Sequence, residues 1–171
     1  MNPQDLNVYV FTSNDYLHIL KPFSFLLNKF WSPEQKVKIV GFRSPDFDLP
    51  SNYEFISLGE QRGLKYWTDD HIDFFQNIED QYFVHMLENE FFLKPLDTTI
   101  YNDLVSRLNP QIGRIDLTPG PSQRSNNLVE NCGDYDIIEI FNPFFIWSRN
   151  NIGLQQTILI ENVFVYLISH F

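Results

Sequence analysis

The segment from Tyr82 to Asp97 constrains the fold of this chain more than any other stretch. It begins with the apolar run Tyr-Phe-Val-His-Met-Leu, and Glu88, Asn89 and Glu90 follow directly. An apolar run of this length is typical of a strand that is buried on both faces of a sheet. In open α/β sheets, ligands bind at the carboxyl ends of the strands. The two carboxylates therefore stand where a buried strand is expected to open onto a binding site.

Glu88 and Glu90 repel each other unless a proton or a cation lies between them. Mg²⁺ and Mn²⁺ prefer oxygen ligands and often share protein carboxylates with substrate phosphates. An acidic-x-acidic triplet is also common by chance, and a solvated turn at the end of a strand explains it too. The pattern leaves both interpretations open, a divalent-metal site and a plain turn.

The first forty residues have the pattern of a strand–helix–strand unit. Residues 7–11 and 36–42 are compact apolar runs, and apolar residues recur at helical spacing from 16 to 30 between them. The polar residues 12–15 are expected to form a turn and a helix N-cap. Pro22 is expected to kink or shorten the helix. A unit of this kind implies parallel strands joined by a right-handed crossover.

The turn after the first strand lacks the usual nucleotide signatures. It contains neither the G-x-G-x-x-G turn of dinucleotide-binding proteins nor the G-x-x-x-x-G-K-[ST] phosphate loop. Any nucleotide would therefore have to be held by other groups.

Two more helices are expected. The first runs from about residue 68 to residue 78, with Thr68 as its N-cap, and the second from Thr98 or Thr99 to about Leu108.

Three further strands are expected, at residues 53–59, 112–117 and 136–140. Residues 118–127 are rich in turn formers and predict a long loop. The last twenty residues predict one apolar helix or strand. Strands that alternate with helices favour a single α/β domain over residues 1–171, with a mostly parallel central sheet and helices on both faces.

Composition excludes several classes of protein. The net charge of −10 argues against nucleic-acid binding, since phosphate contacts need clustered Lys and Arg. The single cysteine, Cys132, allows no internal disulfide and fits a reducing compartment. No signal peptide is visible, and no apolar run approaches the ~20 residues that span a bilayer. We expect a cytoplasmic protein without a membrane span, in which the apolar C-terminal run could serve a homo-oligomer.

Four sequence blocks stand in an order that matches a known family. They are Tyr66–Asp69 (Y-W-T-D), Leu87–Asp97 (L-E-N-E-F-F-L-K-P-L-D), Arg114–Leu117 (R-I-D-L) and Phe141–Arg149 (F-N-P-F-F-I-W-S-R). They resemble the W-[ST]-D, L-E-D-x-F-x-L-x-P-[VL]-[DN], R-[ILV]-D-L and Q-P-x-[IL]-W-x-R blocks of small bacterial and viral glycosyltransferases of the GT-A fold. The similarity extends over most of residues 7–150.

This resemblance implies a Rossmann-like GT-A fold and glycosyl transfer from a nucleotide-diphosphate sugar, such as a UDP-sugar, to a glycan or another hydroxyl acceptor. Glu88, Asn89 and Glu90 would correspond to the D-x-D element, in which a carboxylate holds Mn²⁺ or Mg²⁺ at the donor diphosphate. Asn89 replaces an expected acid there, so the metal would depend on Glu88 and Glu90. The resemblance also places donor contacts at Thr12, Ser13, Asn14, Arg43, Arg62, Lys65 and Asn89.

The C-terminal region departs from the family pattern. Relatives commonly carry a block like E-N-P-W-E-F-E, whereas this chain has Glu161-Asn-Val-Phe-Val-Tyr-Leu167. The two later acids fall on Val165 and Leu167. Loss of a general base typically costs ~10²–10⁴-fold in rate. Asp116 and Glu139 are the remaining candidates for that base.

Two other classes of function stay open. A non-catalytic module that binds nucleotide sugars or glycans would bind the donor without turning it over. A structural protein that uses its many aromatic side chains as an interface would bind no nucleotide.

Overall fold

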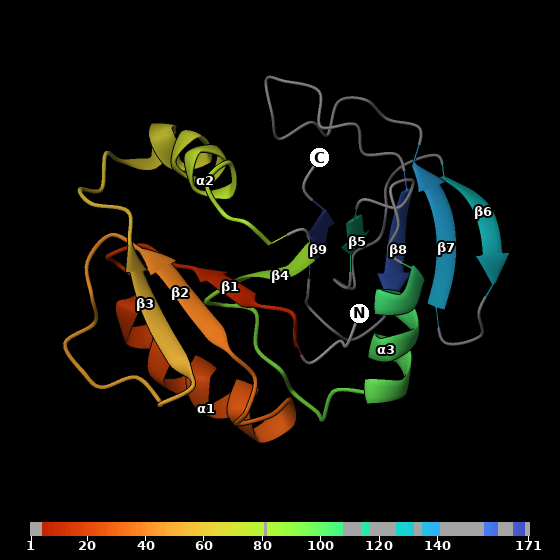
Figure 1. The fold of residues 1–171 in the computed structure, drawn as a ribbon, viewed down its shortest axis with the longest axis horizontal. Coiled ribbons are helices and arrows are strands. Elements are labelled where there is room, and N and C mark those ends of the chain that lie inside the picture. Colours follow the sequence, from red (N-terminus) through yellow and green to blue (C-terminus); the bar gives the residue numbers. More distant parts are fainter. Residues whose placement is uncertain are drawn as a thin grey trace.

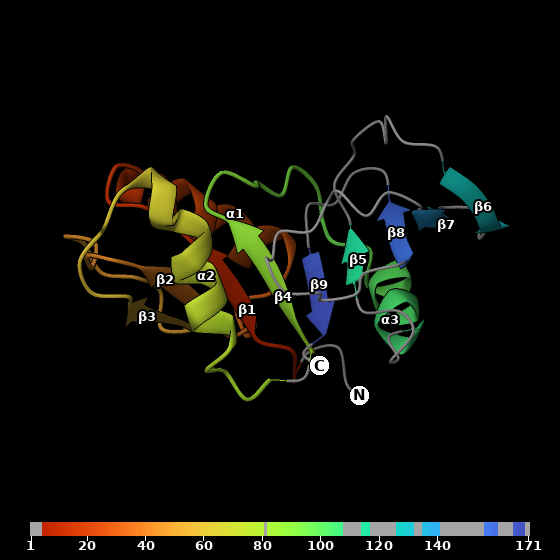
Figure 2. The same cartoon turned by 90° about the horizontal axis from the view of Figure 1, so that it is seen from above.

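The computed structural model describes residues 5–80 and 82–107, together with the backbone of five strands further along the chain. The nine strands of the described residues form one sheet in the order β3-β2-β1-β4-β9-β5-β8-β7-β6 (Figure 1). The helices of the described part lie on the half of the sheet that contains β1 to β4 and, for α3, near β5 and β8 (Figures 1 and 2).

The first four strands are all parallel. They are β1 (Val8–Phe11), β2 (Val37–Gly41), β3 (Tyr53–Ser57) and β4 (Tyr82–Leu87). β1 pairs with β2 on one side and with β4 on the other, and β2 pairs with β3. The expected parallel unit and the buried strand before Glu88 are therefore confirmed, and this half of the chain has α/β character.

The helices lie on both faces of these strands, as expected. They are η2 (Leu17–Ile19), α1 (Leu20–Phe30), η3 (Leu64–Tyr66), α2 (Trp67–Phe75) and α3 (Thr98–Arg107). Side chains of α1 and α3 share one core with Val8, Val10 and Val84. On the opposite face, α2 packs on Tyr9, Phe11, Val40 and Phe83. Figure 1 shows α2 above and α1 below these strands.

The predicted helix starts were partly wrong. No side-chain cap precedes α1, which begins at Leu20, so Pro22 lies in its first turn and breaks no helical hydrogen bond. Thr68 does not cap α2, because that helix already begins at Trp67. Asp97 caps α3, since its Oδ1 accepts hydrogen bonds from the N–H groups of Thr99 and Ile100 at 2.9 and 3.1 Å.

Beyond β4 the sheet is mixed rather than mostly parallel. The five strands are β5 (Arg114–Asp116), β6 (Asn126–Asn131), β7 (Tyr135–Ile140), β8 (Gln156–Ile160) and β9 (Tyr166–Ser169). β9 runs antiparallel between β4 and β5, and among these five described strands only β5 and β8 pair in parallel.

Two predictions for the C-terminal region were wrong in detail. The last twenty residues contain two strands, β8 and β9, rather than one element. Asn126 and Asn127 belong to β6 rather than to the predicted loop, most of which lies outside the described residues. Among the helices of the described part, none is long and apolar enough to cross a membrane.

His71 connects α2 to the end of β1. Its ring stacks on Phe11 with 3.8 Å between ring centroids, and its Nδ1 lies 2.7 Å from the carbonyl oxygen of Trp67. Its Nε2 is buried without a hydrogen-bond partner. Burial lowers the pKa of His71 from 6.5 to about 4, although the Trp67 carbonyl and the Asp70 carboxylate oppose this shift.

We expect His71 to make the protein less stable in mild acid. The unfolded chain binds a proton at the ordinary pKa, so the stability is present above pH 6.5 and is lost as the pH falls toward 4. Between pH 6.5 and pH 5 the loss from this group is about 1.5 kcal/mol. Urea denaturation of wild type and His71→Gln at both pH values measures it, with the exposed His18→Gln as a matched control. An equal acid loss in wild type and His71→Gln would contradict the assignment.

Candidate functional site

The strand order reverses at β1, and this reversal defines the candidate site. β2 and β3 lie on one side of β1, and β4 lies on the other. Phe11 and Leu87 are in register as the last residues of β1 and β4, and the N–H of Glu88 donates to the carbonyl oxygen of Phe11 at 3.3 Å. Thr12 and Glu88 therefore leave two neighbouring strands side by side. In open α/β sheets, ligands bind outside the carboxyl ends of strands at such a switch point.

Thr12 is held tightly against the end of β2. It is buried, and its N–H donates to the carbonyl oxygen of Val40 at 2.9 Å. A Cβ on Gly41 would lie 2.9 Å from Cγ2 of Thr12 and 3.3 Å from its carbonyl oxygen. Only glycine leaves room for this approach, so Gly41 contributes to the shape of the site although the sequence did not mark it as a site residue.

Asn14 connects three loops instead of capping a helix. Its Oδ1 accepts a hydrogen bond from the N–H of Arg43, and its own N–H donates to Oε1 of Gln61, both at 3.1 Å. Ser13 accepts a hydrogen bond from the N–H of Tyr16 through its carbonyl oxygen at 3.1 Å. No local sequence pattern marks Gln61 as a site residue, because its partner Asn14 lies 47 residues away along the chain.

The acidic triplet forms a tight turn at the end of β4. The N–H of Glu90 donates to the carbonyl oxygen of Leu87 at 3.1 Å, and Oε2 of Glu90 accepts from the N–H of Leu87 at 2.7 Å. Asn89 is exposed, whereas Glu88 is only 7% exposed. Glu88 is therefore not the solvated residue that the plain-turn interpretation requires.

The environment of Glu88 favours its neutral form. Burial raises the pKa of the Glu88 carboxyl, and a hydrogen bond from its own backbone N–H offsets part of the rise. A buried carboxyl with a raised pKa at a strand end is a feature that functional sites share with strained structural positions.

A divalent ion at this turn would need ligands from outside the protein. In the part of the chain that the structure describes, no group of three or more His, Cys, Asp and Glu side chains is placed to hold a metal. Mg²⁺ is often bound by only one or two carboxylates, and substrate phosphates and water complete its shell. Glu88 and Glu90 are the two carboxylates that this turn would offer to such a shared site, and metal binding would favour the deprotonated form of Glu88.

The predicted phosphate contacts Arg62 and Lys65 lie toward α2. Nε of Arg62 donates to Oδ1 of Asp70 at 3.0 Å, the same guanidinium pairs with Asp70 through Nη2, and Asp73 lies 3.9 Å away. Nζ of Lys65 lies 4.6 Å from the ring centre of Tyr66. Arg62 would have to leave Asp70 to reach a phosphate, whereas the exposed Arg43 has its backbone tied to Asn14.

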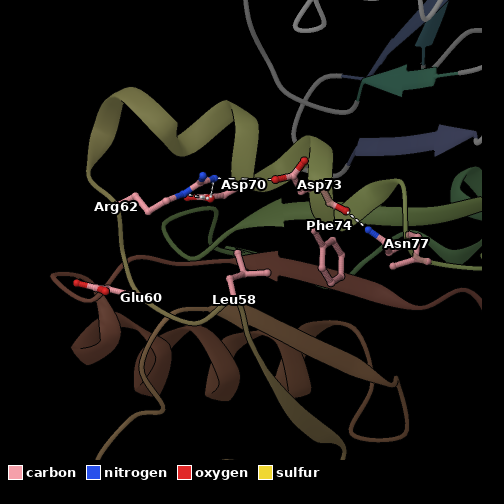
Figure 3. Close-up of a pocket in the computed structure, with 8 residues that line it drawn as sticks. Leu58, Glu60, Arg62, Asp70, Asp73, Phe74 and Asn77 are labelled. Carbon is pink, nitrogen blue, oxygen red and sulfur yellow. Dashed lines mark hydrogen bonds and ion pairs between the residues drawn. The ribbon is translucent and has the colours of Figure 1, made fainter.

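Arg62 and Asp70 also border a cavity of about 600 Å³ between α2 and the end of β3 (Figure 3). Its apolar floor and charged rim consist of Leu58, Glu60, Arg62, Asp70, Asp73, Phe74, Asn77 and Ile78. Figure 3 shows the Arg62 side chain extended along α2 toward Asp70 and Asp73. The cavity lies away from the acidic triplet, which is absent from its lining.

The two candidate bases, Asp116 and Glu139, lie at different distances from β4 in the sheet. Asp116, the last residue of β5, is level with Tyr166 of β9, and Tyr166 is level with His85 of β4. Asp116 thus ends its strand level with His85, three residues before Glu88, with one strand between β4 and β5. Glu139 lies on β7, four strands from β4. The block at 141–149 and residues 161–165 lie outside the described residues.

A scan of protein-family models gives no match to this sequence, and a search of curated proteins finds no similar protein. The resemblance to glycosyltransferases therefore rests on the sequence blocks alone and enters the argument as a proposal.

We expect Glu88→Gln to stabilise the protein at neutral pH. A buried carboxyl with a raised pKa costs stability once it ionises, and the amide removes that cost. The midpoint of thermal unfolding should rise by about 2–4 °C at pH 7 and by less at pH 4, because a smaller fraction of the Glu88 carboxyl is ionised at the lower pH. Calorimetry at both pH values tests this, and the exposed Glu79→Gln is the control. A lower midpoint at pH 7 would show that the charged form is favourably bound.

Proposed function

We propose that this protein binds a nucleotide-diphosphate sugar at the carboxyl ends of β1 and β4 and transfers the sugar to a hydroxyl acceptor. The observation that carries the proposal is the pairing of the two strand ends at the point where the strand order reverses. Thr12 and Glu88 follow adjacent strands there, and the Glu88 N–H bonds to the Phe11 carbonyl. The same residues lie in the two regions where the resemblance to GT-A glycosyltransferases expects donor contacts.

Different residues would bind the nucleotide and the metal. Thr12, Ser13 and Asn14 would contact the nucleotide from the loop after β1, and Arg43 would approach from the loop after β2. Glu88 and Glu90 would hold Mn²⁺ or Mg²⁺, which when bound supplies charge neutralisation at the departing diphosphate. The protein would bind and orient the donor, which are contributions that need no covalent step.

A base that removes the acceptor proton is the open part of the proposal. Asp116 is the better placed candidate, since β5 lies two strands from β4, whereas β7, which carries Glu139, lies four strands from it. The missing acids at Val165 and Leu167 favour a second function, a binding module that holds nucleotide sugars without turnover. The two functions share the donor site and differ only in catalysis.

Isothermal titration calorimetry with UDP and UDP-glucose, with and without Mn²⁺, tests the donor site. We expect Mn²⁺ to tighten binding by about tenfold or more, because the ion bridges carboxylates and phosphates. The double variant Glu88→Gln/Glu90→Gln should lose this metal dependence, and the amides keep the size of the side chains and an acceptor for the Leu87 N–H. Glu34→Gln/Glu79→Gln, two exposed carboxylates that precede β2 and β4, is the matched control.

Each outcome separates the functions. If binding of the donor depends neither on Mn²⁺ nor on the double substitution, the nucleotide-sugar site stands and the metal-binding role of Glu88 and Glu90 is overturned. The absence of binding for a panel of nucleotide sugars would overturn the proposal and favour an interaction protein. If the donor binds, release of UDP from UDP-glucose in the presence of Mn²⁺ distinguishes an enzyme from a binding module, and Asp116→Asn should lower that release by about 10²-fold or more.

A further inference from the structure

We infer that Asn14 and Gln61 act as positioning residues, which clasp the loops after β1, β2 and β3 into one wall of the donor site. The inference rests on the proposed function and adds to it a pair of side chains that act through the backbone of their neighbours. We call the group formed by Asn14, Gln61 and the backbone N–H of Arg43 the clasp.

The clasp lies just beyond the last backbone hydrogen bonds that join β1, β2 and β3. The N–H of Thr12 donates to the carbonyl of Val40 at 2.9 Å, and the N–H of Leu58 donates to the carbonyl of Gly41 at 2.7 Å. Past these points the three loops leave the sheet. The two hydrogen bonds of Asn14, each 3.1 Å long, then connect the loop after β1 to the other two loops.

The loop after β3 depends on such side-chain anchors. Gly59 and Gly63 flank Gln61 with φ of +85° and +96°, and a Cβ on either glycine would meet no atom within 4 Å. Glycine backbones of this kind are free to adopt several conformations. Gln61 fixes the loop to Asn14, and its neighbour Arg62 fixes it to Asp70 of α2. The clasp and this ion pair form one continuous network from the loop after β2 to α2.

The hydrogen bonds assign a positioning role to both side chains. Oδ1 of Asn14 is used by the Arg43 N–H, and Oε1 of Gln61 is used by the Asn14 N–H. Both side chains are half-buried, and Arg43, the cation expected at the donor, is exposed on the loop that Asn14 holds. Loss of either acceptor oxygen would release a loop without opening the core, because Thr12 and the strands remain paired.

The first test uses no ligand. Amide hydrogen exchange measured by NMR should become about tenfold faster at Arg43 in Asn14→Ala and at Asn14 in Gln61→Ala, since each substitution removes one hydrogen bond. Asn14→Asp and Gln61→Glu keep an acceptor oxygen and should restore slow exchange. Asn102→Ala, an exposed amide on α3, is the control. Unchanged exchange in the alanine variants would overturn the clasp.

The second test measures the affinity of the protein for the donor, UDP-glucose. The Kd for UDP-glucose with Mn²⁺ should rise by about tenfold in Asn14→Ala and in Gln61→Ala, and the double variant should lose less than the product of the two effects, because both belong to one network. The midpoint of thermal unfolding should stay close to that of wild type. Asn102→Ala should bind like wild type.

Different results would overturn the positioning role of the clasp and the proposed donor site. If wild type binds UDP-glucose and both alanine variants bind it equally well, the positioning role is overturned and the donor site stands. If wild type binds no nucleotide sugar, the proposed function and the donor role of the clasp both fall, whatever the exchange data show.

Discussion

The parallel pairing of β1 with both β2 and β4 is the constraint on which the rest of this structure depends. Because the chain turns to β2 first and reaches β4 only after crossing β1, the order of the strands reverses at β1. The reversal leaves the loops after β1 and β4 to diverge from adjacent strand ends. Thr12 and Glu88 meet there, and the cores made by α1 and α2 on the two faces keep the strands in register.

The site combines a closely packed backbone with a buried carboxyl that lowers the stability of the fold when it is ionised. Thr12 and Gly41 pack with little free space, whereas Glu88 is a carboxyl at 7% exposure whose pKa is raised by burial. A structural turn would gain stability from an uncharged residue at this position. The side chains around it also connect distant loops, since Asn14 and Gln61 are 47 positions apart in sequence. Such an arrangement suits a site that is ordered before its ligand arrives.

Local sequence patterns predicted most strands well, since β1 to β4 lie where they were expected and β5 and β7 fall at the predicted strands 112–117 and 136–140. The runs that became β1, β2, β3 and β4 are apolar and bounded by turn formers, so their strand character follows from burial alone. Helix starts were less predictable, because Thr68 and Thr98 satisfy the same local rule as Asp97, and only the geometry of the preceding loop decides which oxygen reaches the free N–H groups. The apolar C-terminal run was predicted as one element, whereas its described residues form the two strands β8 and β9.

The sequence by itself determined that a buried strand would end in the acidic triplet, because hydrophobic periodicity and charge are properties of neighbouring residues. It also determined the α/β alternation that makes the first strands parallel. Only the tertiary structure decided that Glu88 is buried, that Arg62 pairs with Asp70, and that Asn14 bonds to Gln61 and Arg43. These facts depend on which strand ends and loops become neighbours in space, and that choice is made by long-range pairing and packing rather than by local pattern.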